Sequence, residues 1–215
     1  LPALGDADPA EDALDLLVGA SSRAARIEEL LECYPDSEAG LIRAVSHYAS
    51  IGNGVFLGNS LPIREWNQFA QWTRPYPEVK ANRGANGIDG QVSTWLGWSG
   101  DEDDAWALIG DLTALYDLSA PFVMDQLHKQ GRVLAVINNL GGRIFERLPR
   151  LQSMSPRAAE CMTNPHAADL SGLAALWGMK HLRVRRADDL DAFEPGDQPT
   201  LLEVLPHAEH TKSFW

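Results

Sequence analysis

The sequence predicts an α/β protein of three layers, in which helices cover both faces of a mostly parallel β-sheet. From Gly54 onward, short apolar segments alternate with stretches of helical spacing, a pattern typical of parallel strands joined by crossover helices. Two of the apolar runs stop abruptly at oxygen-bearing side chains, one at Asp111 and the other at Asn138 and Asn139. The chain has 215 residues, which is long enough to bury the substantial core that such a fold requires.

The first fifty residues predict helices rather than strands. Apolar residues recur at helical spacing in three stretches, which cover residues 11–18, 23–34 and 40–49. None of these stretches contains a catalytic motif. We therefore separate residues 1–50, a helical lead-in, from a domain formed by residues 51–215.

Six apolar segments of the second region are predicted to form the sheet. They cover residues 55–57, 79–81, 105–109, 133–137, 181–184 and 201–205. The helices predicted between them are one that Ser60 caps, one at 92–96 after a glycine-rich turn, a crossover helix at 119–129 and one at 170–177. The acidic residues 101–104 fit a solvated turn before the third strand.

The composition argues against several classes of partner. The formal net charge of −12 disfavours nucleic acid and anionic membranes, because both call for basic patches. No apolar run approaches the roughly 20 residues that span a bilayer, and no secretion signal opens the chain. Cys33 and Cys161 form no disulfide framework, so we expect a soluble protein of the reducing cytoplasm. Because the first residue is Leu1 rather than Met, we also expect a piece of a longer protein.

The two strand ends form the strongest candidate site. Neighbouring parallel strands bring their carboxyl ends to one edge of a sheet, so Asp111 and Asn139 are predicted to lie together. A carboxylate, a carboxamide and a glycine carbonyl are hard oxygen ligands, which suit Mg²⁺ better than Zn²⁺ and fit a metal-bound diphosphate. The alternative is structural: Asp111 caps the next helix, and Asn138 and Asn139 form a turn.

Four ordered segments between residues 58 and 149 resemble one known family. Gly110-Asp111-Leu112, followed by Asn138-Asn139 and a glycine, resembles the diphosphate-binding motif of thiamine diphosphate enzymes. Most of that superfamily has glycine where this chain has Leu112. The leucine variant, with the segments 58–64, 81–90, 116–118 and 141–149, is similar to the 2-succinyl-5-enolpyruvyl-6-hydroxy-3-cyclohexene-1-carboxylate synthase family of menaquinone biosynthesis.

The resemblance implies a fold, a cofactor and a metal. Residues 51–215 would be the C-terminal thiamine diphosphate-binding domain, and residues 1–50 the remnant of a linker or middle domain. Thiamine diphosphate carries the reactive carbon, and the protein holds and orients it. Mg²⁺ (or Mn²⁺) is implied as well, with Asp111, the side-chain oxygen of Asn139 and the main-chain carbonyl of Gly141 as its ligands.

Further cofactor contacts follow from the same motif. Gly110, Leu112 and Thr113 would offer backbone and hydroxyl donors to the phosphates at a helix N-terminus. Ile88 aligns with the bulky apolar residue that forces the cofactor into a bent shape. The alternative for Ile88 is an ordinary core isoleucine.

The implied substrates, 2-oxoglutarate and isochorismate, each carry two carboxylates. Arginine suits bidentate carboxylate recognition, and Arg64 and Arg83 occupy the family positions for that role. The substrate site would also include Asn59 and Ser60, with an apolar wall formed by Ile144, Phe145 and Leu148. The alternatives are surface arginines and ordinary hydrophobic packing after the metal loop.

The resemblance also implies what the complete enzyme does. It would decarboxylate 2-oxoglutarate and add the succinyl carbanion equivalent to isochorismate, as a homo-oligomer. The glutamate that activates the cofactor belongs to an N-terminal pyrimidine-binding domain of the same protein type, for which 215 residues leave no room. We therefore expect this chain to be inactive by itself.

Two other functions remain open. One is a different thiamine diphosphate-dependent 2-oxoacid decarboxylase, or the separate subunit of a split enzyme. The other is a non-catalytic interaction module derived from this fold. The six histidines are spaced neither as metal ligands nor as a catalytic triad, and we interpret them as surface residues.

Overall fold

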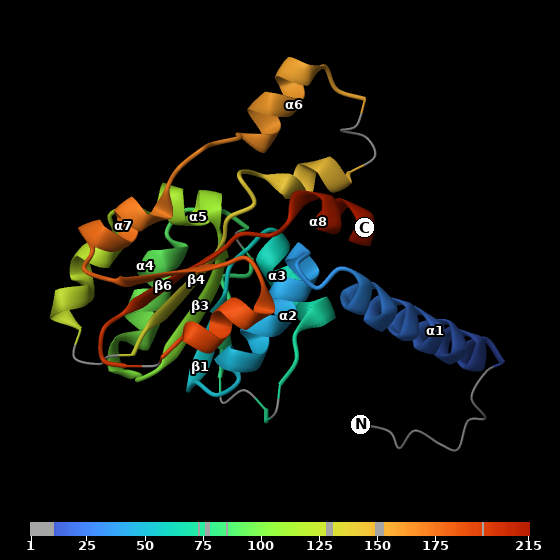
Figure 1. The fold of residues 1–215 in the computed structure, drawn as a ribbon, viewed down its shortest axis with the longest axis horizontal. Coiled ribbons are helices and arrows are strands. Elements are labelled where there is room, and N and C mark those ends of the chain that lie inside the picture. The colour runs from blue at the N-terminus through green and yellow to red at the C-terminus, as the bar shows by residue number, and fades with distance from the viewer. Residues whose placement is uncertain are drawn as a thin grey trace.

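The computed structural model describes residues 11–72, 74–75, 78–84, 86–127, 131–148, 153–194 and 196–215. It contains a sheet of six strands in the order β2-β1-β3-β4-β6-β5 (Figure 1). The strands are β1 (Gly54–Leu57), β2 (Val79–Lys80), β3 (Ala105–Gly110), β4 (Val133–Ile137), β5 (Lys180–Val184) and β6 (Thr200–Val204). Every pair of neighbours is parallel, so the predicted parallel sheet is confirmed.

Helices cover both faces of this sheet, which confirms the three-layer architecture. One face carries α2 (Glu38–Ala49), α3 (Leu61–Phe69) and the 3₁₀ helix η5 (Ala187–Ala192). The other face carries α4 (Gln91–Trp98), α5 (Asp111–Tyr116) and α7 (Leu170–Leu176). Successive residues of β3 alternate between the layers: Leu108 joins the core that contains Leu41 of α2, and Ile109 joins the core that contains Trp95 of α4.

The N-terminal region is helical, as predicted, but its helices differ in extent. A single helix, α1 (Glu11–Cys33), replaces the two that we expected on either side of Gly19, and it projects from the body of the molecule (Figure 1). A glycine inside a helix costs only about 1 kcal/mol and does not by itself end it. The next helix, α2, packs into the central core through Leu41, Ile42 and Val45. The assignment of residues 1–50 to a linker or middle domain stays a prediction.

Two predicted helical features are wrong in detail. Ser60 precedes α3, but its φ of 75° lies outside the extended region of a capping residue, and its side chain makes no capping bond to a described residue. The predicted crossover helix is a 3₁₀ helix, η2 (Ala120–Gln126), and only Ala120 and Pro121 of it are buried. An α-helix in a protein is stabilised mainly by burying one face, and this segment buries too little.

The remaining helices are short. They are η1 (Ser99–Asp101), η3 (Arg143–Arg147), α6 (Pro156–Thr163) and α8 (Ala208–Phe214). The end of the predicted crossover helix at 128–129, and Ala85 and Pro149 of the family-like segments, lie outside the described residues. In the part of the chain that the structure describes, no helix is long and apolar enough to cross a membrane.

Candidate functional site

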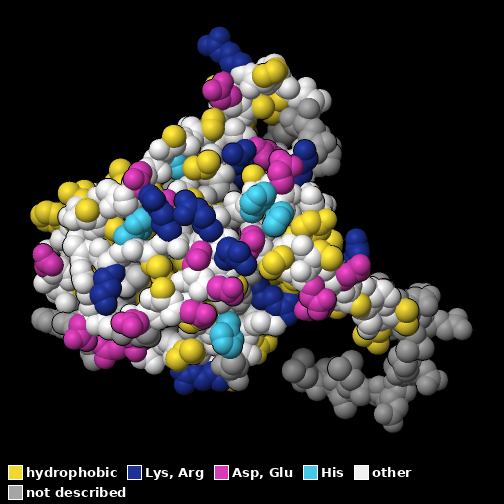
Figure 2. Space-filling view, viewed as in Figure 1, with side chains coloured by type: hydrophobic (Ala, Val, Ile, Leu, Met, Phe, Trp, Pro, Cys, Tyr) yellow, Lys and Arg dark blue, Asp and Glu magenta, His cyan; other side chains and the backbone are white. Residues whose placement is uncertain are grey.

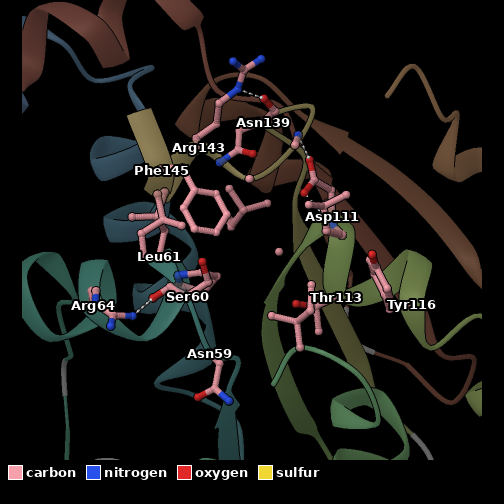
Figure 3. Close-up of a pocket in the computed structure, with 18 of the residues that line it drawn as sticks. Asn59, Ser60, Leu61, Arg64, Asp111, Thr113, Tyr116, Asn139, Arg143 and Phe145 are labelled. Atoms are coloured by element: carbon pink, nitrogen blue, oxygen red, sulfur yellow. Dashed lines mark hydrogen bonds between the residues drawn. The ribbon is translucent and has the colours of Figure 1, made fainter. Parts of the chain in front are cut away.

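A cavity of about 740 Å³ opens where β1, β3 and β4 end. Figure 3 shows its side chains around a common space, with Ser60 and Arg64 on one side and Asp111 and Thr113 on the other. The predicted site residues that line it are Asn59, Ser60, Arg64, Arg83, Ile88, Gly110, Asp111, Leu112, Thr113, Asn139, Gly141, Ile144 and Phe145. Leu148 is not among the lining residues and is 47% exposed. The roles assigned to these residues stay predictions.

Asp111 is the first residue of α5 and follows β3 directly. Its Oδ2 accepts a hydrogen bond from the backbone N–H of Gly141 over 2.9 Å, and its Oδ1 accepts one from Leu112 over 2.6 Å. Burial raises the pKa of Asp111, while these two N–H groups and His166 lower it. The carboxylate therefore joins the end of β3 to the loop after β4, and it also contacts the first turn of its own helix.

Asn139 lies two residues after the end of β4, and both its side chain and its main chain make hydrogen bonds. Its Nδ2 donates to Oε1 of Glu38 over 2.9 Å, and its main-chain oxygen accepts from Nε of Arg143 over 2.9 Å. Its Oδ1 is buried and has no hydrogen-bond partner among the described residues. A buried acceptor without a partner costs free energy unless something else occupies it.

The loop after Asn139 requires a glycine. Gly141 has a φ of 137°, a conformation that side chains strongly disfavour, and a Cβ there would lie 2.6 Å from the carbonyl oxygen of Thr163. The backbone of residues 140–142 can therefore approach both Asp111 and Thr163. Gly142 N–H donates to that same Thr163 oxygen over 2.6 Å.

The opposite wall of the cavity is formed by the segment after β1. Asn59 is buried, and its Oδ1 accepts a hydrogen bond from Arg83 over 2.9 Å. Arg64 donates to the carbonyl oxygen of Ser60 over 2.6 Å, as Figure 3 shows. Both arginines are exposed to solvent on the side of the cavity, so their remaining N–H groups can receive an anionic ligand.

The sequence did not indicate a buried charged cluster beside this cavity, one member of which, Glu38, lines the cavity wall. Glu38 of α2 and Glu65 of α3 are each 1% exposed, and Arg147 of η3 lies 3.7 Å from the former and 2.7 Å from the latter. Burial and the neighbouring Glu65 carboxyl raise the pKa of Glu38 well above its usual range, and Arg147 opposes that shift. The pKa of Glu65 is also raised by burial and lowered by Arg147.

Two of the histidines lie beside buried carboxylates rather than on the open surface. Nε2 of His166 lies 3.1 Å from Oδ2 of Asp111, and Nε2 of His181 lies 2.9 Å from Oε2 of the buried Glu203. Both rings are mostly shielded, so the interpretation of all six histidines as surface residues is wrong. The partners come from distant parts of the chain, and no local spacing could have shown them.

Comparison with known proteins places this architecture in a family, although no protein-family model matches the chain. Over 217 aligned residues, covering 100% of this chain and 40% of the relative, it is 44% identical to the 2-succinyl-5-enolpyruvyl-6-hydroxy-3-cyclohexene-1-carboxylate synthase of Akkermansia muciniphila. It is 42% identical over 196 residues to the enzyme of that name from Bdellovibrio bacteriovorus, covering 91% of the chain and 35% of the relative. By sequence, the chain belongs to this synthase family. A relative from Shewanella frigidimarina is 35% identical over 162 residues, which are 75% of the chain and 27% of the relative.

The similarity to the synthase family has a defined extent. The chain spans 27–40% of the length of these three relatives. The six-stranded parallel sheet with helices on both faces is the fold expected for the diphosphate-binding domain of a synthase of this kind. The family membership therefore agrees with the resemblance found at the strand ends.

The oxygen-rich edge of the cavity differs from common transition-metal sites. Within the described ranges, no group of three His, Cys, Asp or Glu side chains is arranged to hold a metal. This edge contains the carboxylate of Asp111, the carboxamide of Asn139 and the backbone of Gly141, whose carbonyl oxygen also accepts a hydrogen bond from the N–H of Arg143 over 2.9 Å. Such a donor set suits a cation that keeps part of its shell for water and phosphate rather than one enclosed by protein.

Proposed function

We propose that this chain is the C-terminal, diphosphate-binding part of a thiamine diphosphate-dependent synthase that acts in menaquinone biosynthesis. The complete enzyme would decarboxylate 2-oxoglutarate and join the resulting succinyl unit to isochorismate. The observation that carries the proposal is the convergence of Asp111, Asn139 and Gly141 on one cavity, in a chain 44% identical to a synthase of that name.

Mg²⁺ or Mn²⁺ is the cation that this edge of the cavity would hold. Its ligands would be Asp111, Oδ1 of Asn139 and the carbonyl of Gly141. Oδ1 of Asn139 is buried and has no hydrogen-bond partner in the described part of the chain, which supports this assignment, because a bound cation would satisfy an acceptor that otherwise costs free energy. All three donors are hard oxygens, in agreement with the preference of Mg²⁺.

Thiamine diphosphate would supply the carbon nucleophile of the reaction when it is bound. The backbone N–H groups near Gly110 and Leu112, and the hydroxyl of Thr113, would bind its phosphates beside the metal. Ile88, half-buried on the cavity wall, would press the cofactor into its bent shape. Since α5 has six residues, these phosphates would depend on individual donors more than on a helix dipole.

The arginines would provide substrate recognition. Arg64 and Arg83 both line the cavity: Arg64 lies in α3, after β1, whereas Arg83 follows β2 and donates a hydrogen bond to Oδ1 of Asn59. Their guanidinium groups would bind the carboxylates of 2-oxoglutarate and isochorismate. Ile144 and Phe145 would form the apolar wall, whereas Leu148 lies outside the cavity and would contribute only through movement of η3 or a neighbouring domain.

The same proposal includes a partner. The activating glutamate would come from an N-terminal pyrimidine-binding domain, in a homo-oligomer located in the cytoplasm, so the 215-residue chain alone would be inactive. Hydrophobic side chains gather at the end of the molecule that carries α7 (Figure 2), where Phe122 is 70% and Leu176 68% exposed. Exposed apolar surface of this kind fits contact with another domain or subunit.

The test uses the full-length protein that contains this sequence. We expect calorimetry to detect thiamine diphosphate binding that depends on Mg²⁺, and we expect turnover that requires both 2-oxoglutarate and isochorismate. The isolated chain should show no turnover until the N-terminal domain is added. Turnover of a 2-oxoacid without isochorismate would favour a decarboxylase, and absence of cofactor binding in the full-length protein would leave the interaction module.

A further inference from the structure

Glu38 is a buried acidic residue on the wall of the same cavity, and none of the family-like segments contains it. It is 1% exposed and belongs to the first turn of α2, which precedes the strand-end motifs in the sequence. Buried glutamates are rare unless other groups satisfy them. Its Oε1 accepts the hydrogen bond from Nδ2 of Asn139 over 2.9 Å, across 101 residues of sequence.

The position of Glu38 is itself fixed from several sides. Its backbone N–H donates to Oγ1 of Thr211 over 2.9 Å, which ties the start of α2 to α8. Its second carboxyl oxygen faces Arg147, whose guanidinium lies 4.1 Å from the ring centre of Trp215. The carboxyl group that accepts the hydrogen bond from Asn139 therefore belongs to a helix that is fixed in place by these contacts.

A carboxamide that is held at its nitrogen has a defined orientation. The NH₂ end of Asn139 is occupied by Glu38, so Oδ1 is turned to the other side, where it is buried and has no described partner. Without Glu38, the amide group could rotate and exchange its two ends at little cost. We propose that Glu38 is a positioning residue that holds the carboxamide of Asn139 with its oxygen toward the cation site. This inference rests on the proposed function, because it assumes that Asn139 is a metal ligand.

A positioning role differs from a purely structural one in what a substitution changes. Groups that orient a metal ligand typically account for roughly 10- to 100-fold in metal affinity. Glu38→Met removes the acceptor at similar side-chain length, whereas Glu38→Gln keeps a carbonyl oxygen that can accept from Asn139. Glu38→Asp keeps the carboxyl group but moves it one methylene farther from Asn139, so it serves as a second test should the Met variant not fold.

The experiment measures the affinity of the full-length protein for Mg²⁺ by calorimetry at a fixed concentration of thiamine diphosphate. We expect Glu38→Met and Glu38→Asp to weaken Mg²⁺ binding roughly 10-fold or more, and Glu38→Gln to stay within about threefold of wild type. Glu65→Met is the matched control, because Glu65 is equally buried and faces the same Arg147 but, among the described residues, does not hydrogen-bond to Asn139. Equal losses from Glu38→Met and Glu65→Met would overturn the proposal.

A double-mutant cycle with Asn139→Ala separates this inference from the proposed function. If Glu38 acts through Asn139, then Glu38→Met should cause no further loss of Mg²⁺ affinity once Asn139 is alanine. Additive losses would overturn the positioning role alone. Unchanged affinity in Asn139→Ala would instead overturn the assignment of Asn139 as a ligand, and the inference with it.

Discussion

Arg147 joins two walls of the cavity, because its guanidinium lies 2.7 Å from Oε1 of Glu65. Arg147 ends η3, which carries Ile144 and Phe145, whereas Glu65 follows Arg64 in α3. The ion pair therefore fixes the apolar wall relative to the helix that presents an arginine to the cavity. The guanidinium also stacks over the ring of Trp215, with its central carbon 4.1 Å from the ring centre.

Loss of this cation should destabilise the fold. Arg147→Met leaves the buried carboxyls of Glu38 and Glu65 without their positive partner, and we expect the free energy of unfolding of the chain to fall by roughly 2–4 kcal/mol. Urea-induced unfolding followed by circular dichroism measures this change. The control is Arg26→Met, which breaks an exposed pair with Glu29 and should leave the free energy of unfolding almost unchanged. Similar effects from the two variants would show that the buried cluster contributes little.

The raised pKa of Glu38 predicts a dependence of stability on pH. A carboxyl whose pKa is higher in the folded than in the unfolded chain favours folding fully below the unfolded value, and this contribution is lost as the pH rises toward the folded pKa. Glu38→Gln cannot ionise. The unfolding free energy of the Gln variant should therefore gain on wild type as the pH rises above the usual glutamate pKa of about 4.3, by up to ~1.4 kcal/mol per pH unit. A difference between the two proteins that stays constant over this range would contradict the pKa assignment.

Alanine should have opposite effects on stability at two of the glycines, Gly141 and Gly97. Gly141→Ala places a Cβ 2.6 Å from the Thr163 oxygen in a disfavoured backbone conformation, and we expect a loss of roughly 1–3 kcal/mol in unfolding free energy. Gly97 lies within α4 and has open space around its Cβ position, so Gly97→Ala should stabilise by about 0.5 kcal/mol. Thermal unfolding of the two variants checks both signs. Equal tolerance of alanine at the two positions would mean that the loop after Asn139 can relax.

The sheet could be predicted from the sequence because buried parallel strands appear as continuous apolar runs. All six predicted strands are present, with ends shifted by at most one residue, and Asp111 and Asn139 follow adjacent strands as expected. Their placement needed only local apolar runs and the rule that parallel strands end at one edge.

Features that depend on distant contacts could not be predicted. Glu38, Glu65 and Arg147 come from three helices far apart in the sequence, and each looks like an ordinary surface charge in its own segment. His166 lies in an irregular stretch before α7 and meets Asp111 only in the folded chain. The short helix α6 buries no side chain, so periodicity does not indicate it, whereas η2 lies within the predicted helix 119–129 but is shorter and of 3₁₀ type.

Asp111 tests the metal site directly. Asp111→Ala in the full-length protein should abolish Mg²⁺-dependent binding of thiamine diphosphate, because it removes the charged ligand, while the strands on either side keep their packing. Calorimetry measures the binding, and circular dichroism confirms the fold. Thr113→Ser is a mild control at the same edge, since it keeps the hydroxyl. Cofactor affinity that is unchanged in Asp111→Ala would rule out this carboxylate as a ligand.

Arg64 and Arg83 distinguish the proposed synthase from a general decarboxylase. If they bind substrate carboxylates, Arg64→Ala and Arg83→Ala should each reduce kcat/KM roughly tenfold or more, because a charged hydrogen-bond donor is lost at the cavity. Thiamine diphosphate affinity should stay nearly unchanged, and replacement by lysine should recover only part of the rate, since an ammonium group cannot form the planar two-point contact.

The assay for these arginines varies 2-oxoglutarate and isochorismate separately in the full-length enzyme. A larger effect on one KM identifies the substrate that each arginine contacts. Arg83 also donates to Asn59, so Asn59→Ala is an informative companion: it should change kinetics only if Arg83 needs that support to hold its position. Normal kinetics for both substrates in both alanine variants would disprove carboxylate binding and leave a cofactor-binding domain whose substrates are recognised elsewhere.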